Sequence, residues 1–327
     1  MLSRSAYGLY WMSRYLERAD HVSRLLAAQF QAIEDRPVQE IDQNWRRLHA
    51  ALSSTPTAGF LHSDHDDDDF MLTDSFTLAD ELTFERINPD SLISCIENAR
   101  ENARQVRFVV GKQTWSLLNA SYLELKDVGI QNIWNDEPRS FYLEIASGIR
   151  RLFGTMHSTM YRDHGWYFTQ LGRYVERVQL VCSLIQAQLA NTSVRKLYFA
   201  QDWYFVLQVC EASLALRRVR ASAHHPDKIA AFLISDARLS HSVEYALLVI
   251  KQCLEAVSEG HRHPAKIAIN EKVEQMIRQS DGVMLADGST HGDVSEILRE
   301  IQDSARQLND DIDQAYLNYD VASYPGV

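Results

Sequence analysis

Glycine and proline are scarce in this sequence, with 13 glycines and 7 prolines among 327 residues. Both fall below average usage, and the few that occur stand between periodic segments, as in a helix-rich chain with short connections. Hydrophobic residues make up 46% of the chain and charged residues 24%, which excludes a largely disordered chain and indicates a packed interior. The composition therefore predicts an all-α fold rather than one that contains sheet.

Cysteine and long apolar runs are also scarce. The cysteines lie far apart and form no C-x-x-C pair, which excludes a disulfide framework and a cysteine zinc site; they are Cys95, Cys182, Cys210 and Cys253. This usage fits a reducing compartment, and we expect a cytoplasmic protein. No apolar run approaches the roughly 20 residues that span a bilayer. Because Arg4, Arg14 and Glu17 interrupt the first apolar residues, we expect neither a membrane partner nor a signal peptide.

Positive charge is in deficit, with a formal net charge of −11. This net charge excludes general nucleic-acid binding, which needs a cationic surface to release counterions from phosphates. A local basic pocket is still compatible with a negative net charge. The sequence also contains no Gly-rich phosphate loop, no G-x-S-x-G nucleophile elbow and no H-E-x-x-H zinc helix. We therefore expect no cofactor bound by this chain itself, and no self-sufficient ATP-dependent enzyme.

Two stretches combine histidine with acidic or histidine neighbours. The stretch His62–Asp69 lacks the Gly and the terminal Glu that a calcium loop requires, so we interpret it as a solvated acidic loop. The pair His261 and His263, beside Pro264, has no evident third ligand. The sequence therefore predicts no metal site.

Apolar residues recur at spacings of three and four near the start of the chain, which predicts an amphipathic helix. The members of this stripe are Leu9, Met12, Leu16, Ala19, Val22 and Leu26. Similar spacing predicts further helices over 45–52, 142–160 and 293–319, and a helix that follows a capping turn at 88–91 and continues to about residue 116.

Two halves of the chain resemble each other. Residues 9–26 align without gaps with residues 168–185, at an offset of 159, and both segments contain Arg-Tyr-x-Glu-Arg. Two further anchors follow in the same order, Trp45 with Trp203 and Ser91 with Ser242. Three ordered anchors argue for an internal duplication. The sequence therefore predicts a helical bundle formed by two pseudo-equivalent internal repeats.

We expect one domain over residues 1–327 rather than two domains on a flexible tether. Its predicted parts are repeat one over about 1–135, a linking helix over about 138–160, repeat two over about 161–260 and C-terminal helices over about 265–320. The linking helix carries its own apolar stripe, which favours packing between the halves.

The duplicated motif places two arginines one turn apart on each predicted helix. The pairs are Arg14 with Arg18 and Arg173 with Arg177. On a helical wheel Arg18 falls between Trp11 and Leu25, beside apolar surface. A buried arginine must find a carboxylate or an anionic ligand, because leaving it unpaired costs several kcal/mol.

Two interpretations of these arginines follow. In the first, Glu17 and Glu176 form structural salt bridges with them, exchanged between the two copies. In the second, the guanidinium groups line a pocket for carboxylate or phosphate groups, which they hold by bidentate contacts.

The segment Glu97–Arg104 contains the tetrapeptide Glu-Asn-Ala-Arg twice in succession, so each residue type recurs after four positions, near the same face of a helix. Small apolar members can then pack closely on a neighbour, and Glu97 with Arg100, like Glu101 with Arg104, makes an ordinary surface pair. The functional alternative places Glu101, Asn102 and Arg104 beside the duplicated arginines. A further candidate segment, Arg162–Trp166, directly precedes the second Arg-Tyr-x-Glu-Arg helix. Asp163 is a candidate helix cap there, and His164 is a candidate acid or base.

The opening segment Leu9–Ala19 resembles the bacterial Alpha-E family, predicted helical proteins named for a Glu-Arg motif. The resemblance covers essentially the whole chain in a shared order, through the segments 88–91, 101–104, 122–125, 162–166, 173–177 and 232–236. The acidic stretch 62–69 departs from the family's pattern, as does Val178, where the family usually has Ala.

The resemblance implies a partnership rather than an activity. Members of the family are associated with circularly permuted ATP-grasp amide ligases and with transglutaminase-like peptidases, at times within one polypeptide. This chain contains neither kind of segment, so such partners would be separate proteins. ATP and Mg would then enter only through the partner ligase.

Three hypotheses follow for the function. The first is an accessory or substrate-binding component of a peptide or amide ligase system, which holds an anionic or peptide ligand; its candidate ligand-binding residues are Arg14, Glu17, Arg18, Glu101, Asn102, Arg104, Arg173, Glu176 and Arg177. The second is a stand-alone amide-bond-forming or cleaving enzyme, with Glu17 or Glu176 as general base. The third is a structural protein–protein adaptor with no small ligand.

Overall fold

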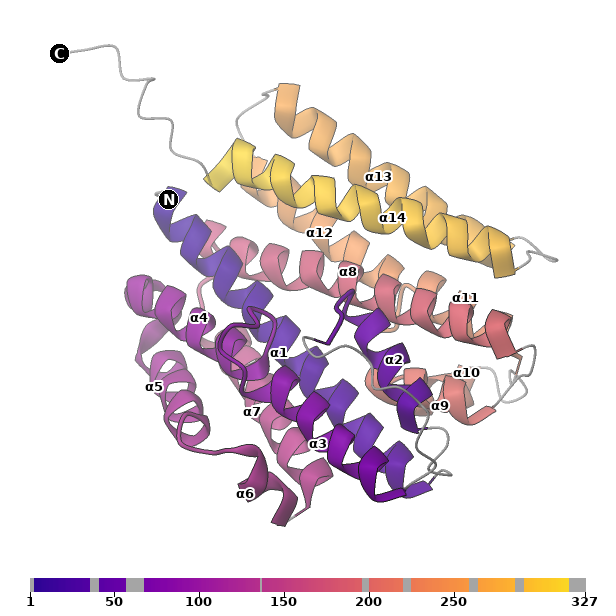
Figure 1. Ribbon diagram of the computed structural model, residues 1–327. Helices are drawn as coiled ribbons and strands as arrows, with labels where there is room; N and C mark the ends of the chain where they lie inside the picture. Colours follow the sequence, from indigo (N-terminus) through magenta and orange to yellow (C-terminus); the bar gives the residue numbers. More distant parts are fainter. Residues whose placement is uncertain are drawn as a thin grey trace.

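The computed structural model describes residues 3–35, 41–56, 68–135, 137–195, 200–219, 225–258, 264–285 and 291–317. These residues form fourteen α-helices and one short π-helix, and no strand occurs among them (Figure 1). The predicted all-α fold is confirmed. Residues 62–67, 261 and 263, which belong to the two histidine-containing stretches, lie outside the described residues.

The helices alternate between long and short. In chain order they are α1 (Ser3–Asp35), α2 (Ile41–Ala51), α3 (Asp68–Thr83), α4 (Leu92–Gln105), α5 (Arg107–Leu125), α6 (Ile130–Asn135), α7 (Pro138–Thr159), α8 (His164–Arg195), α9 (Ala200–Val209), α10 (Ser213–Val219), α11 (Pro226–Ser235), α12 (Val243–Ser258), α13 (Pro264–Leu285) and α14 (His291–Ile312), followed by the π-helix η2 (Asp313–Leu317). No helix within these ranges combines the length and apolar character that a bilayer crossing requires.

The two longest helices, α1 and α8, form the centre of the bundle and pack along each other (Figure 1). Helices α4 and α7 cover α1, whereas α12 and α14 cover α8. The six apolar residues of the predicted stripe on α1 are all fully buried. Residues 19–30 of α1 are buried on every face, so polar side chains in this stretch lose their contact with water and need partners inside the protein.

A glycine sets the distance between the two central helices. A Cβ atom added to Gly172 would lie 2.8 Å from the carbonyl carbon of Tyr10 and would overlap its oxygen. The backbones of α1 and α8 therefore touch at this point. Further along, Arg14 of α1 pairs with Glu176 of α8, so residue numbers rise together and the helices run in the same direction.

We expect Gly172→Ala to destabilise the protein by about 1–3 kcal/mol, because the added methyl group must push two helix backbones apart. Urea unfolding followed by circular dichroism measures this loss. Gly154→Ala on the exposed face of α7 is the matched control, since nothing lies within 4 Å of its added Cβ atom. The control should gain about 0.5–1 kcal/mol from helix propensity. Equal stability of the two variants would contradict the close contact.

Two predicted helices differ from the structure. The helix expected between the turn at 88–91 and about residue 116 is two helices, α4 and α5, which Val106 separates with a φ of −113° and a ψ of 21°. The break aims the buried Val106 side chain at Gly8 of α1, where a Cβ atom would come within 2.9 Å of it. The final helix ends at Ile312 rather than continuing to 319, and η2 follows it.

The other predicted helices agree with the structure. Helix α2 covers most of 45–52, and α7 covers 142–159 of the predicted linking helix. Ser91 caps α4 by accepting a hydrogen bond from the backbone N–H of Ser94, as the turn at 88–91 predicts.

Candidate functional site

Glu176 of α8 lies between two arginines of α1. Arg14 donates from Nε to the carboxylate at 2.7 Å, and Arg18 donates from Nε to its other oxygen at 2.6 Å. We call Arg14, Arg18 and Glu176 the Glu176 triad. Asn309 of α14 accepts a further bond from Arg14, and Asp90 before α4 pairs with Arg18.

Glu17 of α1 lies between two arginines of α8 in the same way. Arg177 donates to both of its oxygens, at 2.5 and 2.8 Å, and Arg173 donates from Nε at 3.1 Å. We call Glu17, Arg173 and Arg177 the Glu17 triad. Each helix thus supplies a glutamate to the arginines of the other, with every residue of one triad 159 positions from its counterpart. The structure places the motif residues in the exchanged salt bridges of the structural interpretation.

Burial and charge act in opposite directions on the two glutamates, each of which is 1% exposed. Burial by itself raises the pKa of Glu17, but the guanidinium groups of Arg177 and Arg173 outweigh it and bring the pKa to about 2. Arg14 and Arg18 likewise overcome burial and hold the pKa of Glu176 below its usual value. Because a general base works best with a pKa near the operating pH, this electrostatic environment disfavours either glutamate as a base.

The four arginines differ in exposure. The side chains of Arg14 and Arg177 are 5% and 2% exposed, whereas those of Arg18 and Arg173 are 22% and 21% exposed. Arg173 lies over the ring of Phe153, with its guanidinium carbon 3.9 Å from the ring centre. Only its Nε donates to a described residue. Its two terminal nitrogens are therefore available to a ligand.

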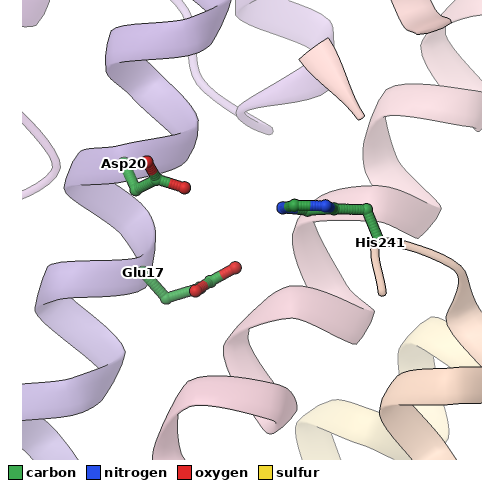
Figure 2. Close-up of side chains that lie close together, drawn as sticks. All are labelled: Glu17, Asp20 and His241. Carbon is green, nitrogen blue, oxygen red and sulfur yellow. The ribbon is translucent and has the colours of Figure 1, made fainter. Parts of the chain in front are cut away.

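A second group of buried polar residues adjoins the Glu17 triad. Asp20, one turn after Glu17, accepts from Arg24 through one carboxylate oxygen, at 3.1 Å, while its other oxygen has no hydrogen-bond partner. His241, from the turn before α12, faces both carboxylates across the helix interface (Figure 2). One donor atom from each of Glu17, Asp20 and His241 lies within 4.8 Å of the others. We call these three residues the Glu17–Asp20–His241 cluster.

Burial keeps the histidines near this cluster neutral. It lowers the pKa of His21 to about 3, with a smaller contribution from Arg24. It also lowers the pKa of His241 well below its usual value, and the neighbouring charge of Arg177 acts in the same direction. Burial raises the pKa of Asp20, although Arg24 opposes this.

The chain matches, over residues 1–317, the model of a predicted alpha-helical domain with a conserved ER motif, named Alpha-E. The chain belongs to the Alpha-E family. Its two Glu-Arg pairs, at 17–18 and 176–177, contribute to the centre of the fold, where each glutamate binds arginines of the opposite helix.

Relatives from two mycobacteria are similar over nearly the whole chain. Uncharacterized proteins of Mycobacterium bovis and of Mycobacterium tuberculosis are each 26% identical over 320 residues, which cover 92% of this chain. The same alignment covers 35% of each relative, so the chain spans about a third of the length of these proteins. No solved structure matches the chain.

The other predicted site residues of the Alpha-E chain have their hydrogen-bond and ion-pair partners outside the two triads. Glu101 and Arg104 pair with each other at 2.6 Å on an exposed face of α4, as the surface interpretation predicts. Asn102 donates to the backbone carbonyl of Asn98 one turn earlier. The predicted pair of Glu97 with Arg100 is wrong, because Glu97 pairs with Arg86, and Arg100 donates to Asn119.

The segment before α8 caps that helix. Asp163 accepts bonds from the backbone N–H groups of Gly165 and Trp166, which confirms its predicted role. His164 is exposed and borders an open cavity of about 570 Å³ with Arg162 and Val109. Within the part of the chain that the structure describes, no hydrogen bond or ion pair joins His164 to either triad.

Sequence reasoning did not identify Asp20, Arg24 or His241 as site residues. A signal was present, because Asp20 follows Glu17 by three positions and therefore lies on the same side of α1. His241 stands directly before Ser242, which caps α12 by accepting from the N–H of Tyr245. Asp90 stands in the same relation to Ser91, so the aligned anchors pointed to both residues.

Proposed function

We propose that this Alpha-E chain is an accessory, substrate-binding component of a peptide or amide ligase system that works with a circularly permuted ATP-grasp partner. The observation that carries the proposal is Arg173, whose half-buried guanidinium group keeps both terminal nitrogens available while Glu17 and Phe153 hold it in place. A guanidinium edge of this kind binds a carboxylate or phosphate group by donating two parallel hydrogen bonds to its oxygens.

The residues of the motif divide into two roles under this proposal. Arg14, Arg177 and the two glutamates are buried and hold the central helices together. Arg18 and Arg173 reach solvent, and these two would contact an anionic peptide or a phosphorylated intermediate. Asp90, which already pairs with Arg18, illustrates the carboxylate chemistry that such an arginine selects.

The length of the relatives supports a role beside other domains. About two thirds of each mycobacterial relative lies outside the part that this chain matches. A module that occurs within longer proteins is suited to act on a substrate together with neighbouring domains. We therefore propose an ATP-grasp ligase as the main partner and a transglutaminase-like peptidase as a second one, on the family's associations.

We also infer that the two halves of the chain are pseudo-equivalent copies. The exchanged triads support this, and so do the other anchors. Trp45 and Trp203 are both almost fully buried, and Ser91 and Ser242 cap their helices through the same hydrogen bond. The contacts are exchanged again outside the triads, since α2 packs on α8 while α9 packs on α1.

We expect Arg173→Met to weaken the binding of a glutamate-rich peptide by about 10- to 100-fold, the value of a charge-assisted pair of hydrogen bonds. Titration calorimetry of the purified chain measures the affinity. Folding should be retained, because Arg177 still neutralises Glu17 in the variant. Arg299→Met, which removes an exposed arginine of α14, should bind the peptide like the unmodified chain.

The same pair of variants tests the partnership. In a mixture of the chain, its ATP-grasp ligase, ATP and the peptide, product formation should require the chain and should fall with Arg173→Met. A chain that releases no heat with the peptide but still stimulates the ligase would support the adaptor hypothesis instead. Turnover by the chain without any ligase would support the stand-alone enzyme.

A further inference from the structure

We propose that the Glu17–Asp20–His241 cluster binds a divalent transition-metal ion. The cluster supplies two carboxylates and one imidazole from two elements that the fold brings together, α1 and the turn before α12 (Figure 2). Its donor atoms lie within 4.8 Å of one another, and the three residues are 1%, 3% and 8% exposed. The cluster shares Glu17 with Arg173, which donates to it from Nε, and its test requires no ligase partner.

The unpartnered oxygen of Asp20 is the observation that points to a ligand. This atom is buried and accepts no hydrogen bond, and the side chain is aimed between Glu17 and His241 (Figure 2). A buried carboxylate oxygen without a partner is costly, so its place in a native fold calls for a bound group. The neighbouring oxygens and the imidazole also have lone pairs to offer, which makes a cation the matching group.

Hydrogen bonds from neighbouring residues already hold the three side chains of the cluster. Arg24 holds the other oxygen of Asp20, and Arg177 holds both oxygens of Glu17. The Nδ1 atom of His241 lies 3.3 Å from the hydroxyl of Ser240, which leaves Nε2 as the metal-binding nitrogen. Hydrogen bonds of this kind orient metal ligands in characterised sites.

The donor set selects the class of metal. Imidazole suits Zn²⁺ and its neighbours in the first transition row, and carboxylates suit Mn²⁺ as well, whereas Mg²⁺ prefers oxygen ligands and water. Donors bound to one ion at about 2.1 Å lie about 3.4 Å apart in a tetrahedral site. The donor atoms therefore need to approach one another by up to about 1.4 Å, which rotations of the outer side-chain bonds supply.

The surrounding arginines determine what else the ion would bind. Arg24, Arg173 and Arg177 carry three positive charges beside the two negative charges of Glu17 and Asp20. A divalent ion adds to this excess, so it needs an anionic co-ligand such as hydroxide, carboxylate or phosphate in its open positions. We therefore expect a binding site with exchangeable coordination positions rather than a closed structural one.

The other half of the fold shows what a comparable position looks like without these ligands. The residue 159 positions after Asp20 is Gln179, an amide that accepts from Arg14 and donates to the backbone carbonyl of Ala305. In the first half, Asp90 is the counterpart of His241, because it precedes Ser91 as His241 precedes Ser242. Asp90 pairs with Arg18. The residues beside the Glu176 triad therefore already have partners within the protein, and no buried metal-binding oxygen without a partner is left among these described residues. A substitution beside this triad can serve as the control for one beside the Glu17 triad.

The test measures Zn²⁺, Mn²⁺ and Mg²⁺ binding to the full chain by calorimetry after treatment with a chelator. We expect one equivalent of Zn²⁺ per chain, weaker binding of Mn²⁺ and no measurable Mg²⁺ binding. Asp20→Asn and His241→Gln should each weaken Zn²⁺ binding at least tenfold, about the smallest effect of disturbing a metal site. Asp90→Asn and His164→Gln are the matched controls and should bind like the unmodified chain.

The variants distinguish Zn²⁺ binding at the Glu17–Asp20–His241 cluster from Zn²⁺ binding at other histidines. The sequence also contains His62, His65, His261 and His263, which could hold Zn²⁺ elsewhere. If Asp20→Asn and His241→Gln bind Zn²⁺ as tightly as the unmodified chain, the metal lies elsewhere and the proposal is overturned. A chelator-treated chain that takes up no Zn²⁺ or Mn²⁺ overturns it as well. Circular dichroism identifies a variant that fails to fold, and the comparison then rests on the other variant.

Discussion

Replacing Arg177 by Met is expected to remove about 3–5 kcal/mol of stability, the usual effect of breaking a buried ion pair by deleting one partner. The side chain is 2% exposed and supplies three hydrogen bonds, two to Glu17 and one to the carbonyl of Ser240. In the variant Glu17 stays buried with only the single bond from Arg173. Urea unfolding gives the difference in the free energy of unfolding.

A double variant isolates the ion pair from the packing. Combining Glu17→Met with Arg177→Met removes both charges, and it should be more stable than Arg177→Met alone because no uncompensated carboxylate stays buried. Arg299→Met serves as the surface control and should change stability by less than about 0.5 kcal/mol. If Arg177→Met costs no more than this control, the triads do not hold the central helices together.

Acidification is expected to destabilise the protein well before most carboxylates titrate, and His21 should account for much of this loss. Its pKa is about 3 in the folded protein and about 6.5 when unfolded, so the unfolded chain binds a proton first as the pH falls. The stabilisation is complete above pH 6.5 and is lost on the way down to pH 3. At pH 4.5 the loss amounts to about 3 kcal/mol.

Substitution by Leu tests this assignment. His21→Leu removes the proton-binding group, so its stability should fall less steeply between pH 6.5 and 4.5 than that of the unmodified chain. His164→Leu, at an exposed position, should follow the unmodified chain. Thermal melting at a series of pH values compares the three. Parallel curves for His21→Leu and the unmodified chain would show that the buried imidazole does not control acid stability.

The same measurements should reveal two further contributions with opposite signs. The lowered pKa of Glu17 adds stability above about pH 4.5, which is lost as the pH falls towards 2. The raised pKa of Asp20 acts the other way, since ionising this carboxyl group costs stability as the pH rises. The contribution of Asp20 therefore acts against the acid loss.

Local patterns were sufficient to predict the central helices and their ion pairs. The apolar stripe from Leu9 to Leu26 lies within α1, and its aligned counterpart lies within α8. The rule that a buried arginine requires a carboxylate was also sufficient to suggest the exchange of Glu17 and Glu176 between helices. These features depend on spacing within one helix and on charge balance, and both can be read from a sequence.

Tertiary contacts account for the features that the sequence did not reveal. The break at Val106 depends on its contact with Gly8, about a hundred residues earlier in the chain. Glu97 could pair with either Arg100 or Arg86. It pairs with Arg86 because the loop before α4, which carries Arg86, lies against this helix. Asp20 and His241 are separated by 221 positions, so no spacing rule connects them. The candidate metal site becomes visible only when α1 and α12 are placed in space.

The contact between the backbones of Tyr10 and Gly172 has a mechanical consequence. Sliding α1 along α8 by one residue would misalign both triads at once, and rotating α8 would bring a Cβ-bearing residue against the backbone of Tyr10 in place of Gly172. The central pair is thus fixed in register and in rotation. Any rearrangement that a partner induces is expected in the outer layers, such as α5 and α13, while the ligand-facing arginines keep a constant separation.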